Sequence, residues 1–241
     1  MAGEGRRFRD IGFTIPKHMI IVKGKTLFWW SISSLKNYFE SQFIFIARNE
    51  PGNSEFIKNE CRNLGIKSFR IIELSQLTKG QAETALKAQE AIDDPNEEIM
   101  IYNIDTYVEA EALPSGIIKG QGWVPAFHAE GDKWSFVKFK DDFTVTEITE
   151  KIRISQYGTI GLYYFKSFSL FKECYEKFKW GGYKEEYIAP IYNIIIKDPK
   201  MKLYTCIIPE KYVHVLGTPQ DVVQFWPEFS KVIDKMKKLG N

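Results

Sequence analysis

The feature that most constrains this chain is an alternation of strand-like and helix-like segments over its first hundred residues. Short apolar runs lie at 43–47, 68–72 and 98–104, and helical patterns lie between them at 54–64 and 78–92. Apolar runs of this length indicate strands that are covered on both faces, and helices between them indicate parallel crossovers. The pattern therefore predicts an α/β protein with a doubly wound, mostly parallel or mixed, Rossmann-like sheet.

From about residue 122 the pattern changes to short segments joined by tight turns. Segments 123–129, 135–140 and 144–148 are separated by Gly131-Asp132 and Asp141-Asp142, which favours antiparallel strands. Further strands are predicted at 159–165, 202–208 and 212–215, and further helices at 27–39, 168–178, 185–196 and 220–239. Because no flexible linker or repeat interrupts these segments, we expect a single domain over 1–241.

The composition excludes several classes of protein. Thirty-three basic and 31 acidic residues leave a net charge of +2, which is too balanced for electrostatic capture of nucleic acid. Cys61, Cys174 and Cys206 form no CxxC pair, so we expect reduced thiols rather than disulfides or a zinc site. No apolar run approaches the roughly 20 residues that span a bilayer, and no signal peptide opens the sequence, so we expect a cytoplasmic protein without membrane contact. Aromatic residues make up 15% of the chain, and we expect their rings to fill the core.

The N-terminal stretch and one internal aspartate carry the clearest chemistry. Gly3 and Gly5 allow the backbone to approach a ligand closely, and Arg7 and Lys17 supply positive charge for phosphate groups. A solvated basic segment is the alternative. Asp105 follows the third apolar run, and ligands of doubly wound sheets bind beyond the carboxyl ends of the strands. We expect Asp105 to bind a metal ion, although it would also suit a turn.

Seven motifs follow one another in an order that resembles a known family. They are AGEGRRF at the start, PK about ten residues later, GQAET, the strand ending at Asp105, ITEKIRIS, GLYYF and HVLGTPQD. In this order they resemble the sugar-phosphate nucleotidylyltransferases, from residue 1 to about residue 225. The resemblance implies transfer from a nucleoside triphosphate to a phosphorylated small-molecule acceptor, with release of pyrophosphate and with Mg²⁺ as cofactor. It also implies a nucleotide-binding half at 1–121 and an acceptor-binding half, with a small antiparallel lobe, at 122–241.

The resemblance assigns roles residue by residue. The positions that match the triphosphate loop and the reacting centre are Gly3, Gly5, Arg7 and Lys17, of which Arg7 and Lys17 are implied to be catalytic. The positions that match contacts to base and ribose are Gly80, Gln81 and Glu83. Asp105 matches the Mg²⁺-binding aspartate, and the acceptor-binding positions are Glu150, Lys151 and Gly161.

Several positions have simpler explanations. Glu150 and Lys151 also suit a surface ion pair at a sheet edge, and Gly161 also suits a packing glycine. Glu186 and Tyr187 suit a helix start, although they could lie near the acceptor. Two further sets are expected to be structural or peripheral: His18, His128 and His214, and Trp123, Trp134 and Trp180.

The sequence departs from the family pattern in two places. The family has an apolar strand before the glycine loop, which is not found before Gly3, and we expect a chain extended by such a strand to be more stable. The family also places a second metal-binding aspartate two residues before Gly217, where this sequence has Val215. The metal site is then either incomplete or completed by another residue, such as Asp221.

The family analogy implies a sugar 1-phosphate acceptor, used for surface polysaccharide precursors such as capsule or lipopolysaccharide. The alternatives are a cytidylyltransferase for a non-sugar phosphate such as phosphocholine, a non-catalytic nucleotide-binding relative, and a glycosyltransferase. The cationic GxGxR and PK motifs favour a triphosphate substrate over the diphosphate donor of a glycosyltransferase.

Overall fold

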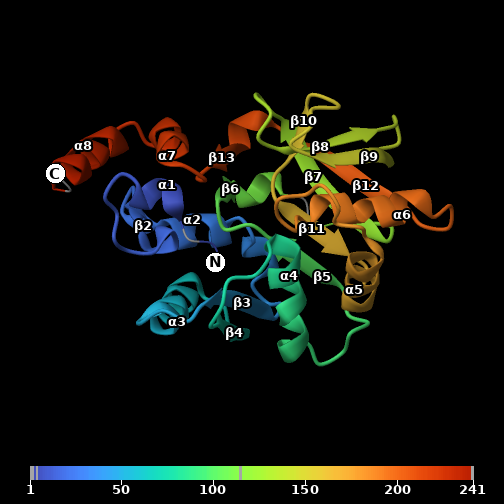
Figure 1. The fold of residues 1–241 in the computed structure, drawn as a ribbon, viewed down its shortest axis with the longest axis horizontal. Coiled ribbons are helices and arrows are strands. Elements are labelled where there is room, and N and C mark those ends of the chain that lie inside the picture. Colours follow the sequence, from blue (N-terminus) through green and yellow to red (C-terminus); the bar gives the residue numbers. More distant parts are fainter. Residues whose placement is uncertain (1–2, 4, 114–115, 240–241) are drawn as a thin grey trace. The chain divides into compact units, whose positions relative to one another are not determined.

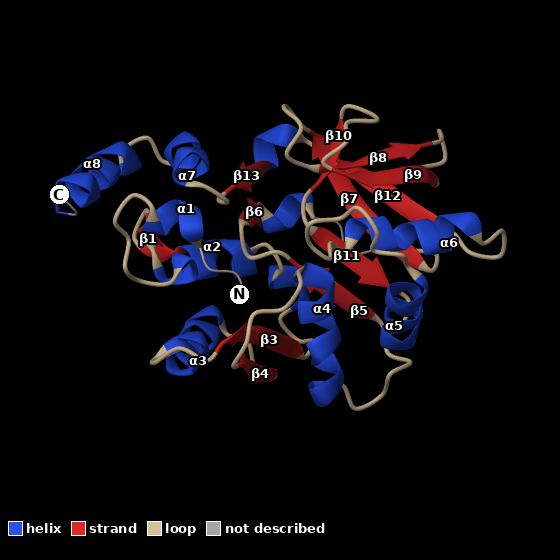
Figure 2. Cartoon of the chain, in the orientation of Figure 1, coloured by secondary structure: helices blue, strands red, loops and turns tan. Residues whose placement is uncertain are grey.

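The computed structural model of the chain describes residues 3, 5–113 and 116–239 (Figure 1). The chain forms two compact units, each assembled from segments that are separate in the sequence. Unit 1 comprises Met1–Leu77, Asn103–Leu113 and Lys211–Asn241, and unit 2 comprises Thr78–Tyr102 and Pro114–Glu210. Each unit contains both helices and strands (Figure 2), which agrees with the predicted α/β class. The functional division at residue 121 stays a prediction.

Unit 1 contains one complete strand–helix–strand motif. β3 (Phe43–Arg48) and β4 (Phe69–Leu74) pair in parallel, and α3 (Asn53–Leu64) connects them. The helix ends at Gly65, whose φ of 78° lies in the left-handed region that closes many helices. Its fully buried residue Ile57 packs in a core that also contains Phe45. The strands and the helix predicted for this region are confirmed.

Several of the remaining elements of unit 1 supply residues to a second core, which includes Phe8, Leu27, Val222 and Phe229. The remaining elements are α1 (Arg6–Arg9), β1 (Ile21–Val22), β2 (Lys25–Thr26), α2 (Leu27–Ser33), β6 (Thr106–Val108), β13 (Val213–Val215), α7 (Pro219–Phe225) and α8 (Phe229–Leu239), with 3₁₀ helices at Lys17–Met19, Lys36–Tyr38 and Ala110–Ala112. A further 3₁₀ helix at Glu210–Tyr212 leads into β13. β13 pairs antiparallel with β6, so Val215 lies opposite Thr106.

Two helix predictions in unit 1 are wrong in extent. The helix predicted at 27–39 ends at Ser33, whose hydroxyl donates to the Trp30 carbonyl at 2.7 Å and competes with the helical hydrogen bonds. The helix predicted at 220–239 is divided into α7 and α8, and Pro227 lies between them. Proline lacks the backbone donor that a continuous helix needs at this point.

Unit 2 is built on a seven-stranded sheet. Its strands are β5 (Ile99–Tyr102), β7 (Gly122–His128), β8 (Ser135–Phe139), β9 (Val145–Glu150), β10 (Tyr157–Thr159), β11 (Leu162–Phe165) and β12 (Leu203–Ile208). The order is β5–β11–β7–β10–β8–β9, and β12 pairs in parallel with β7. The pairs along that order are antiparallel. The prediction of mostly parallel pairing is therefore wrong for unit 2, whereas the predictions of a mixed sheet and of antiparallel strands after residue 122 are confirmed.

The connections between strands explain the difference. A parallel pair needs a long crossover such as the one that α3 provides in unit 1, whereas short connections favour antiparallel pairing. The local pattern also does not show which strands are neighbours in the sheet. Only a short loop separates β7 from β8 in the sequence, yet β10 lies between them in the sheet. Gly161, with a φ of 81°, divides the strand predicted at 159–165 into β10 and β11.

Short helices accompany this sheet. They are α4 (Gln81–Leu86), α5 (Phe168–Lys177) and α6 (Asn193–Lys197), with 3₁₀ helices at Lys87–Ala91 and Ala189–Tyr192. The helix predicted at 185–196 begins only at Ala189, with Pro190 in its first turn, where proline is well tolerated. Glu185, Glu186 and Tyr187 consequently lie outside any helix.

Aromatic rings fill the cores of both units, as predicted. The largest fully buried side chains include Trp123, Tyr192, Phe8, Phe28, Phe136, Phe165, Phe168, Phe171 and Phe229. All three cysteines are free and buried, and burial raises the pKa of each thiol to about 12. Across the part of the chain that the structure describes, no helix has the length and apolar character needed to cross a bilayer.

Candidate active site

The N-terminal turn of unit 1 packs closely on Lys17. Gly5 has a φ of 62°, and a Cβ atom placed on it would lie only 3.2 Å from Lys17 Cβ. Its carbonyl accepts a hydrogen bond from Phe8 N at 3.0 Å, which starts α1. Arg7 is exposed on α1, and Gly3 is exposed with no atom within 4 Å of a Cβ placed on it. Gly5 is therefore needed for the approach to Lys17, whereas none of the described residues requires a glycine at Gly3.

Lys17 combines partial burial with nearby carboxylates. Its Nζ lies 3.9 Å from Asp105 Oδ2, and the two side chains are 16% and 47% exposed. Burial lowers the pKa of Lys17, the carboxylates of Asp105 and Asp221 oppose that shift, and Arg7 adds to it. The Lys17 ammonium is poorly hydrated, and at 3.9 Å the Asp105 carboxylate is too far away to form a hydrogen bond with it. Such an ammonium attracts a negatively charged oxygen atom, which a phosphate group can supply.

Asp105 lies in a turn between β5 and β6. The preceding strand ends at Tyr102, so Asp105 does not follow the strand directly as predicted. The Asp105 carbonyl accepts a hydrogen bond from Leu216 N at 2.7 Å, which brings the segment after β13 alongside. A Cβ atom placed on Gly217 would lie 3.7 Å from Asp105 Oδ2 and 3.4 Å from Asp221 Oδ2. Gly217 therefore leaves room beside two carboxylates.

The residues around Asp105 fit a metal ion that is held by one protein carboxylate. Asp221 is committed to its helix, because its Oδ2 accepts hydrogen bonds from Thr218 N at 2.8 Å and from Thr218 Oγ1 at 2.7 Å. The side chain of Val215, opposite Thr106, offers no oxygen. Among the described residues, no three His, Cys, Asp or Glu side chains gather as a metal site. Mg²⁺ commonly uses one or two carboxylates and takes further ligands from substrate phosphates, an arrangement that Asp105 permits.

His18, next to Lys17, is structural as predicted. Its Nε2 lies 2.7 Å from Asn53 Oδ1, and Asn53 Nδ2 donates to Arg48 O at 2.9 Å. Both His18 and Asn53 are buried. Burial lowers the pKa of His18 to about 4, so the imidazole is neutral at neutral pH. The pair joins the lysine segment to the start of α3.

The GQAET loop of unit 2 is fixed by backbone contacts with Glu186. A Cβ atom placed on Gly80 would lie 2.4 Å from Glu186 N and 2.7 Å from Glu186 O, so only glycine fits. Ala82 N donates to Glu186 O at 2.7 Å, and Glu186 N donates to Lys79 O at 3.1 Å. The Glu186 carboxylate accepts a hydrogen bond from Tyr175 OH at 2.6 Å. Gly80 therefore has a packing role in addition to its predicted role in nucleotide binding.

The two side chains of this loop that are predicted to bind the nucleotide also make contacts within the fold. Gln81 Oε1 accepts a long hydrogen bond of 3.5 Å from Ile188 N, and Glu83 Oε2 accepts a short one of 2.5 Å from Lys79 N. Both side chains are half-buried at the start of α4. Gly80, Gln81 and Glu83 thus lie together, and their contact with a nucleotide stays a prediction.

Glu150 is buried at the end of β9. Its side chain is 8% exposed, and its Oε2 accepts a hydrogen bond of 2.5 Å from Ser135 Oγ. Burial raises the pKa of Glu150, while the Ser135 hydroxyl and the Lys151 ammonium oppose that shift. The second carboxylate oxygen, Oε1, lies 3.9 Å from Lys151 Nζ and can accept from a ligand hydroxyl.

Lys151 has an unusual backbone conformation. Its φ of 57° lies in the left-handed region, which a residue with a Cβ seldom adopts. Its ammonium is accessible, with the side chain 52% exposed, and it donates a hydrogen bond to Tyr187 OH at 2.5 Å. Gly161, the third predicted acceptor residue, is buried at the break between β10 and β11. Residues held in such conformations often cluster at functional sites.

Comparison with a family model decides where the chain belongs. The model described as nucleotidyl transferase matches residues 1–224, which is most of the chain. The chain belongs to the nucleotidyl transferase family. No curated protein matches this transferase in sequence.

Solved structures similar to this transferase agree with the family. A nucleoside-diphosphate-sugar pyrophosphorylase from Vibrio cholerae RC9 has 33% identity and a TM-score of 0.86, over 94% of this chain and 98% of that chain. An inositol-1-phosphate CTP transferase from T. maritima has 17% identity and a TM-score of 0.75, over 98% and 92% of the two chains. A UDP-glucose pyrophosphorylase complexed with UDP-glucose has 16% identity and a TM-score of 0.67, over 95% and 96%. The last two likenesses concern the fold alone.

Two residues that contact the segment around Glu150 and Lys151 were not expected from the sequence: Ser135 and Arg153. Ser135 lies directly opposite Glu150 in the β8–β9 ladder, so a correct pairing of the two predicted strands would have found it. Arg153 Nη2 donates to Ala129 O at 2.8 Å, and its Nε lies 3.1 Å from Asp132 Oδ1. No local pattern indicates Arg153, because its partners are distant in sequence. Tyr187 was expected at a helix start or near the acceptor, but its contact with Lys151 was not expected.

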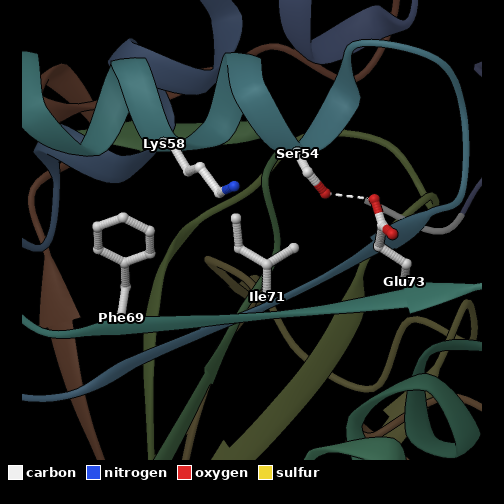
Figure 3. Close-up of a pocket in the computed structure, with 5 residues that line it drawn as sticks. All are labelled: Ser54, Lys58, Phe69, Ile71 and Glu73. Atoms are coloured by element: carbon white, nitrogen blue, oxygen red, sulfur yellow. Dashed lines mark hydrogen bonds between the residues drawn. The ribbon is translucent and has the colours of Figure 1, made fainter.

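A shallow pocket of about 350 Å³ lies elsewhere in unit 1 of the transferase, between α3 and β4 (Figure 3). Its lining residues are Ser54, Lys58, Phe69, Ile71 and Glu73, and the Ser54 hydroxyl donates to Glu73 across its rim. Phe69 and Ile71 pack against the core cluster of unit 1. None of the predicted site residues lines this pocket.

Proposed function

We propose that this chain transfers a nucleotidyl group from a nucleoside triphosphate to a sugar 1-phosphate and releases pyrophosphate. The observation that carries the proposal is the placement of Lys17, whose partly buried ammonium lies 3.9 Å from the half-exposed carboxylate of Asp105. A fixed cation beside a carboxylate suits a site where phosphate oxygens and a metal ion meet.

The reaction needs no protein nucleophile. An acceptor phosphate oxygen attacks the α-phosphorus, a new P–O bond forms, and the bond between the α-phosphorus and the bridging oxygen breaks as pyrophosphate leaves. In the proposal Lys17 and Arg7 neutralise the charge that develops on the phosphate oxygens. The turn at Gly5, together with Gly3, holds the triphosphate, and Gly80, Gln81 and Glu83 contact base and ribose.

The proposed cofactor is Mg²⁺, held by Asp105 together with the substrate phosphates. When bound, the ion would withdraw charge from the phosphate oxygens and align them for in-line transfer. Asp221 supports this arrangement from its helix cap, since its charge opposes the lowering of the Lys17 pKa that burial causes.

The proposed acceptor contacts lie in unit 2. Lys151 binds the acceptor phosphate, Glu150 accepts hydrogen bonds from acceptor hydroxyls, and Gly161 allows the acceptor to approach the backbone. A sugar acceptor is supported by the Vibrio cholerae relative, which is named as a nucleoside-diphosphate-sugar pyrophosphorylase. Such a product would serve surface polysaccharide assembly, such as capsule or lipopolysaccharide, and the proposal assigns the enzyme to the cytoplasm.

One observation favours a second candidate acceptor, a phosphorylated non-sugar alcohol such as phosphocholine that takes a cytidylyl group. Ile152, directly after Lys151, is 64% exposed, and Tyr183 is also exposed. Apolar side chains at these positions suit an acceptor with fewer hydroxyl groups than a sugar. The inositol-1-phosphate CTP transferase shares the fold, and its title names a CTP reaction.

Pyrophosphate release with Mg²⁺ tests the proposal directly. CTP, UTP, GTP and dTTP are each combined with sugar 1-phosphates, inositol 1-phosphate and phosphocholine. Release that requires both substrates supports the reaction and identifies base and acceptor together. Asp105→Ala should abolish release, and Asp234→Ala, which removes an exposed carboxylate from α8, should not. Nucleotide binding without release in any combination would contradict the proposal and favour a non-catalytic binding protein.

A further inference from the structure

Among the described residues, one side chain accepts a hydrogen bond from the Lys151 ammonium, that of Tyr187. Lys151 Nζ donates to Tyr187 OH at 2.5 Å and also lies 4.3 Å from the centroid of the Tyr187 ring. The nearest carboxylate oxygen, Glu150 Oε1, is 3.9 Å away, which is too far for a hydrogen bond. An ammonium has three N–H donors, so one is used by the tyrosine hydroxyl and two stay available.

The backbone of Lys151 is fixed on both sides. Lys151 N donates to Trp134 O at 2.9 Å, and Thr149 Oγ1 donates to Ile152 O at 2.6 Å. The guanidinium of Arg153 adds bonds to the neighbouring loop. A non-glycine residue keeps a left-handed conformation only where its surroundings determine it in this way. With its backbone held in this way, Lys151 keeps conformational freedom in its long side chain, which has many rotamers.

Tyr187 is equally well fixed. The preceding residue, Glu186, exchanges backbone hydrogen bonds with the GQAET loop through Lys79 and Ala82, and its carboxylate accepts from Tyr175 OH. The following residue, Ile188, is fully buried. Tyr187 itself is half-buried between these two anchors, although it belongs to no helix or strand. The flexible side chain of Lys151 therefore contacts a tyrosine, Tyr187, that lies on a well-fixed segment.

We propose that Tyr187 is a positioning residue for acceptor binding, which holds the Lys151 ammonium so that its two remaining N–H groups bind the acceptor phosphate. This inference rests on the proposed function, because it takes Lys151 as the phosphate contact. It names a specific role for a residue that the sequence places at a helix start or near the acceptor. The hydroxyl fixes the direction of one N–H bond, and the ring face attracts the cation.

Chemical labelling of Lys151 tests the contact without any turnover. The native chain, Tyr187→Phe and Tyr187→Leu are treated with an acylating reagent, and the rate at Lys151 is followed by peptide mass spectrometry. Lys119, whose Nζ lies 4.2 Å from the Tyr204 ring, serves as an internal reference in every sample. We expect the Lys151 rate to rise about threefold in Tyr187→Phe and about tenfold in Tyr187→Leu, with Lys119 unchanged. Equal Lys151 rates in all three proteins would overturn the proposal.

Inorganic phosphate and steady-state kinetics test whether the contact serves the acceptor. Inorganic phosphate should protect Lys151 from acylation in the native chain and protect it less in Tyr187→Leu. The acceptor KM should rise about tenfold in Tyr187→Leu, with partial rescue in Tyr187→Phe, while the KM for the nucleoside triphosphate and kcat change less than about twofold. Tyr204→Phe, on the reference pair, should leave all constants unchanged.

The two hypotheses fail in different ways. If the native chain shows no turnover with any substrate pair, the proposed reaction fails, and labelling with phosphate protection still decides whether Tyr187 positions Lys151. If the native chain turns over but Tyr187→Leu changes kcat and both KM values together, the tyrosine has only a general structural role, and the positioning proposal is overturned.

Discussion

Lys17 in unit 1 and Lys151 in unit 2 are held by opposite means. Lys17 is largely buried, lies 3.9 Å from a carboxylate, and packs with its Nζ 5.7 Å from the Phe8 ring centroid. Lys151 is half-exposed and is held by the hydroxyl and the ring of Tyr187. A buried charge acts strongly because the surrounding dielectric constant is low, but burial disfavours its charged form. An exposed lysine keeps its hydration and needs a rigid partner to hold it in one place.

The residue beside each lysine extends the comparison. His18 follows Lys17 and Glu150 precedes Lys151, and both are buried titratable groups. Burial lowers the pKa of His18 to about 4 and raises the pKa of Glu150, so each neighbour is shifted toward its neutral form. The two residues therefore make opposite contributions to stability as the pH falls, and variants can separate these contributions.

The largest expected effect comes from removing the buried lysine. Lys17→Met should lower kcat/KM for pyrophosphate release by about a thousandfold, because a fixed charge beside the phosphates is lost. Lys23→Met, which removes an exposed lysine whose Nζ lies 4.0 Å from the Phe225 ring centroid, should leave kcat/KM unchanged. A similar loss in both variants would mean that burial gives Lys17 no special role.

The next effect is on stability in acid. His18 has its folded-state pKa below its unfolded value of 6.5, so the unfolded chain binds more protons as the pH falls from 6.5 to about 4. The free energy of unfolding should fall by up to about 3 kcal/mol across that window through this one group. Urea unfolding at several pH values measures the loss. It should be smaller in His18→Gln, which can still bond Asn53, and unchanged in His128→Gln, at an exposed site. Parallel pH profiles for native chain and His18→Gln would contradict the assignment.

A moderate effect should follow from restoring a second carboxylate near Asp105. Val215 lies opposite Thr106, the residue after Asp105, so Val215→Asp adds a carboxylate there. The Mg²⁺ concentration that gives half-maximal pyrophosphate release should fall about tenfold, since Mg²⁺ gains a second carboxylate. Val215→Asn controls for shape, and thermal unfolding with and without Mg²⁺ gives a readout that does not depend on turnover. An unchanged Mg²⁺ requirement would show that this position does not reach the metal.

The smallest expected effect is the pH response of Glu150, and its sign is opposite to that of His18. Because its folded-state pKa lies above the unfolded value of 4.5, its contribution to stability is present below pH 4.5 and is lost as the pH rises through the folded-state pKa. Between neutral pH and pH 5 the native chain should gain stability relative to Glu150→Gln. Glu147→Gln, at an exposed position of the same strand, should follow the native profile.

Local sequence patterns predicted which segments form helices and strands better than they predicted which strands pair with each other. The apolar run at 43–47, the helix at 54–64 and the stop at Gly65 could be predicted because each depends on neighbouring residues only. The position of β10 between β7 and β8 depends on contacts across the sheet, which no local pattern encodes. The break at Gly161 was hidden within an otherwise continuous strand pattern.

In the candidate site, too, contacts between residues that are distant in sequence could not be predicted. Gly5, Lys17 and Asp105 were identified from motifs and lie close together in unit 1, although the roles of all the site residues stay predictions. The role of Asp221 as a helix cap could have been predicted, because Thr218 and Asp221 have the spacing of a capping box. The contact between Tyr187 and Lys151 could not, because the two residues are 36 apart in the sequence and the segment of Tyr187 resembles a helix start.

The close packing of Gly80 on Glu186 has a consequence for engineering. The GQAET loop and the KEEY segment are about a hundred residues apart in the sequence, yet backbone hydrogen bonds and the close approach that Gly80 permits join them. A GQAET loop transplanted alone from a relative would lack the KEEY segment against which it packs. When segments of this transferase are exchanged with those of a relative, both segments should therefore be replaced together.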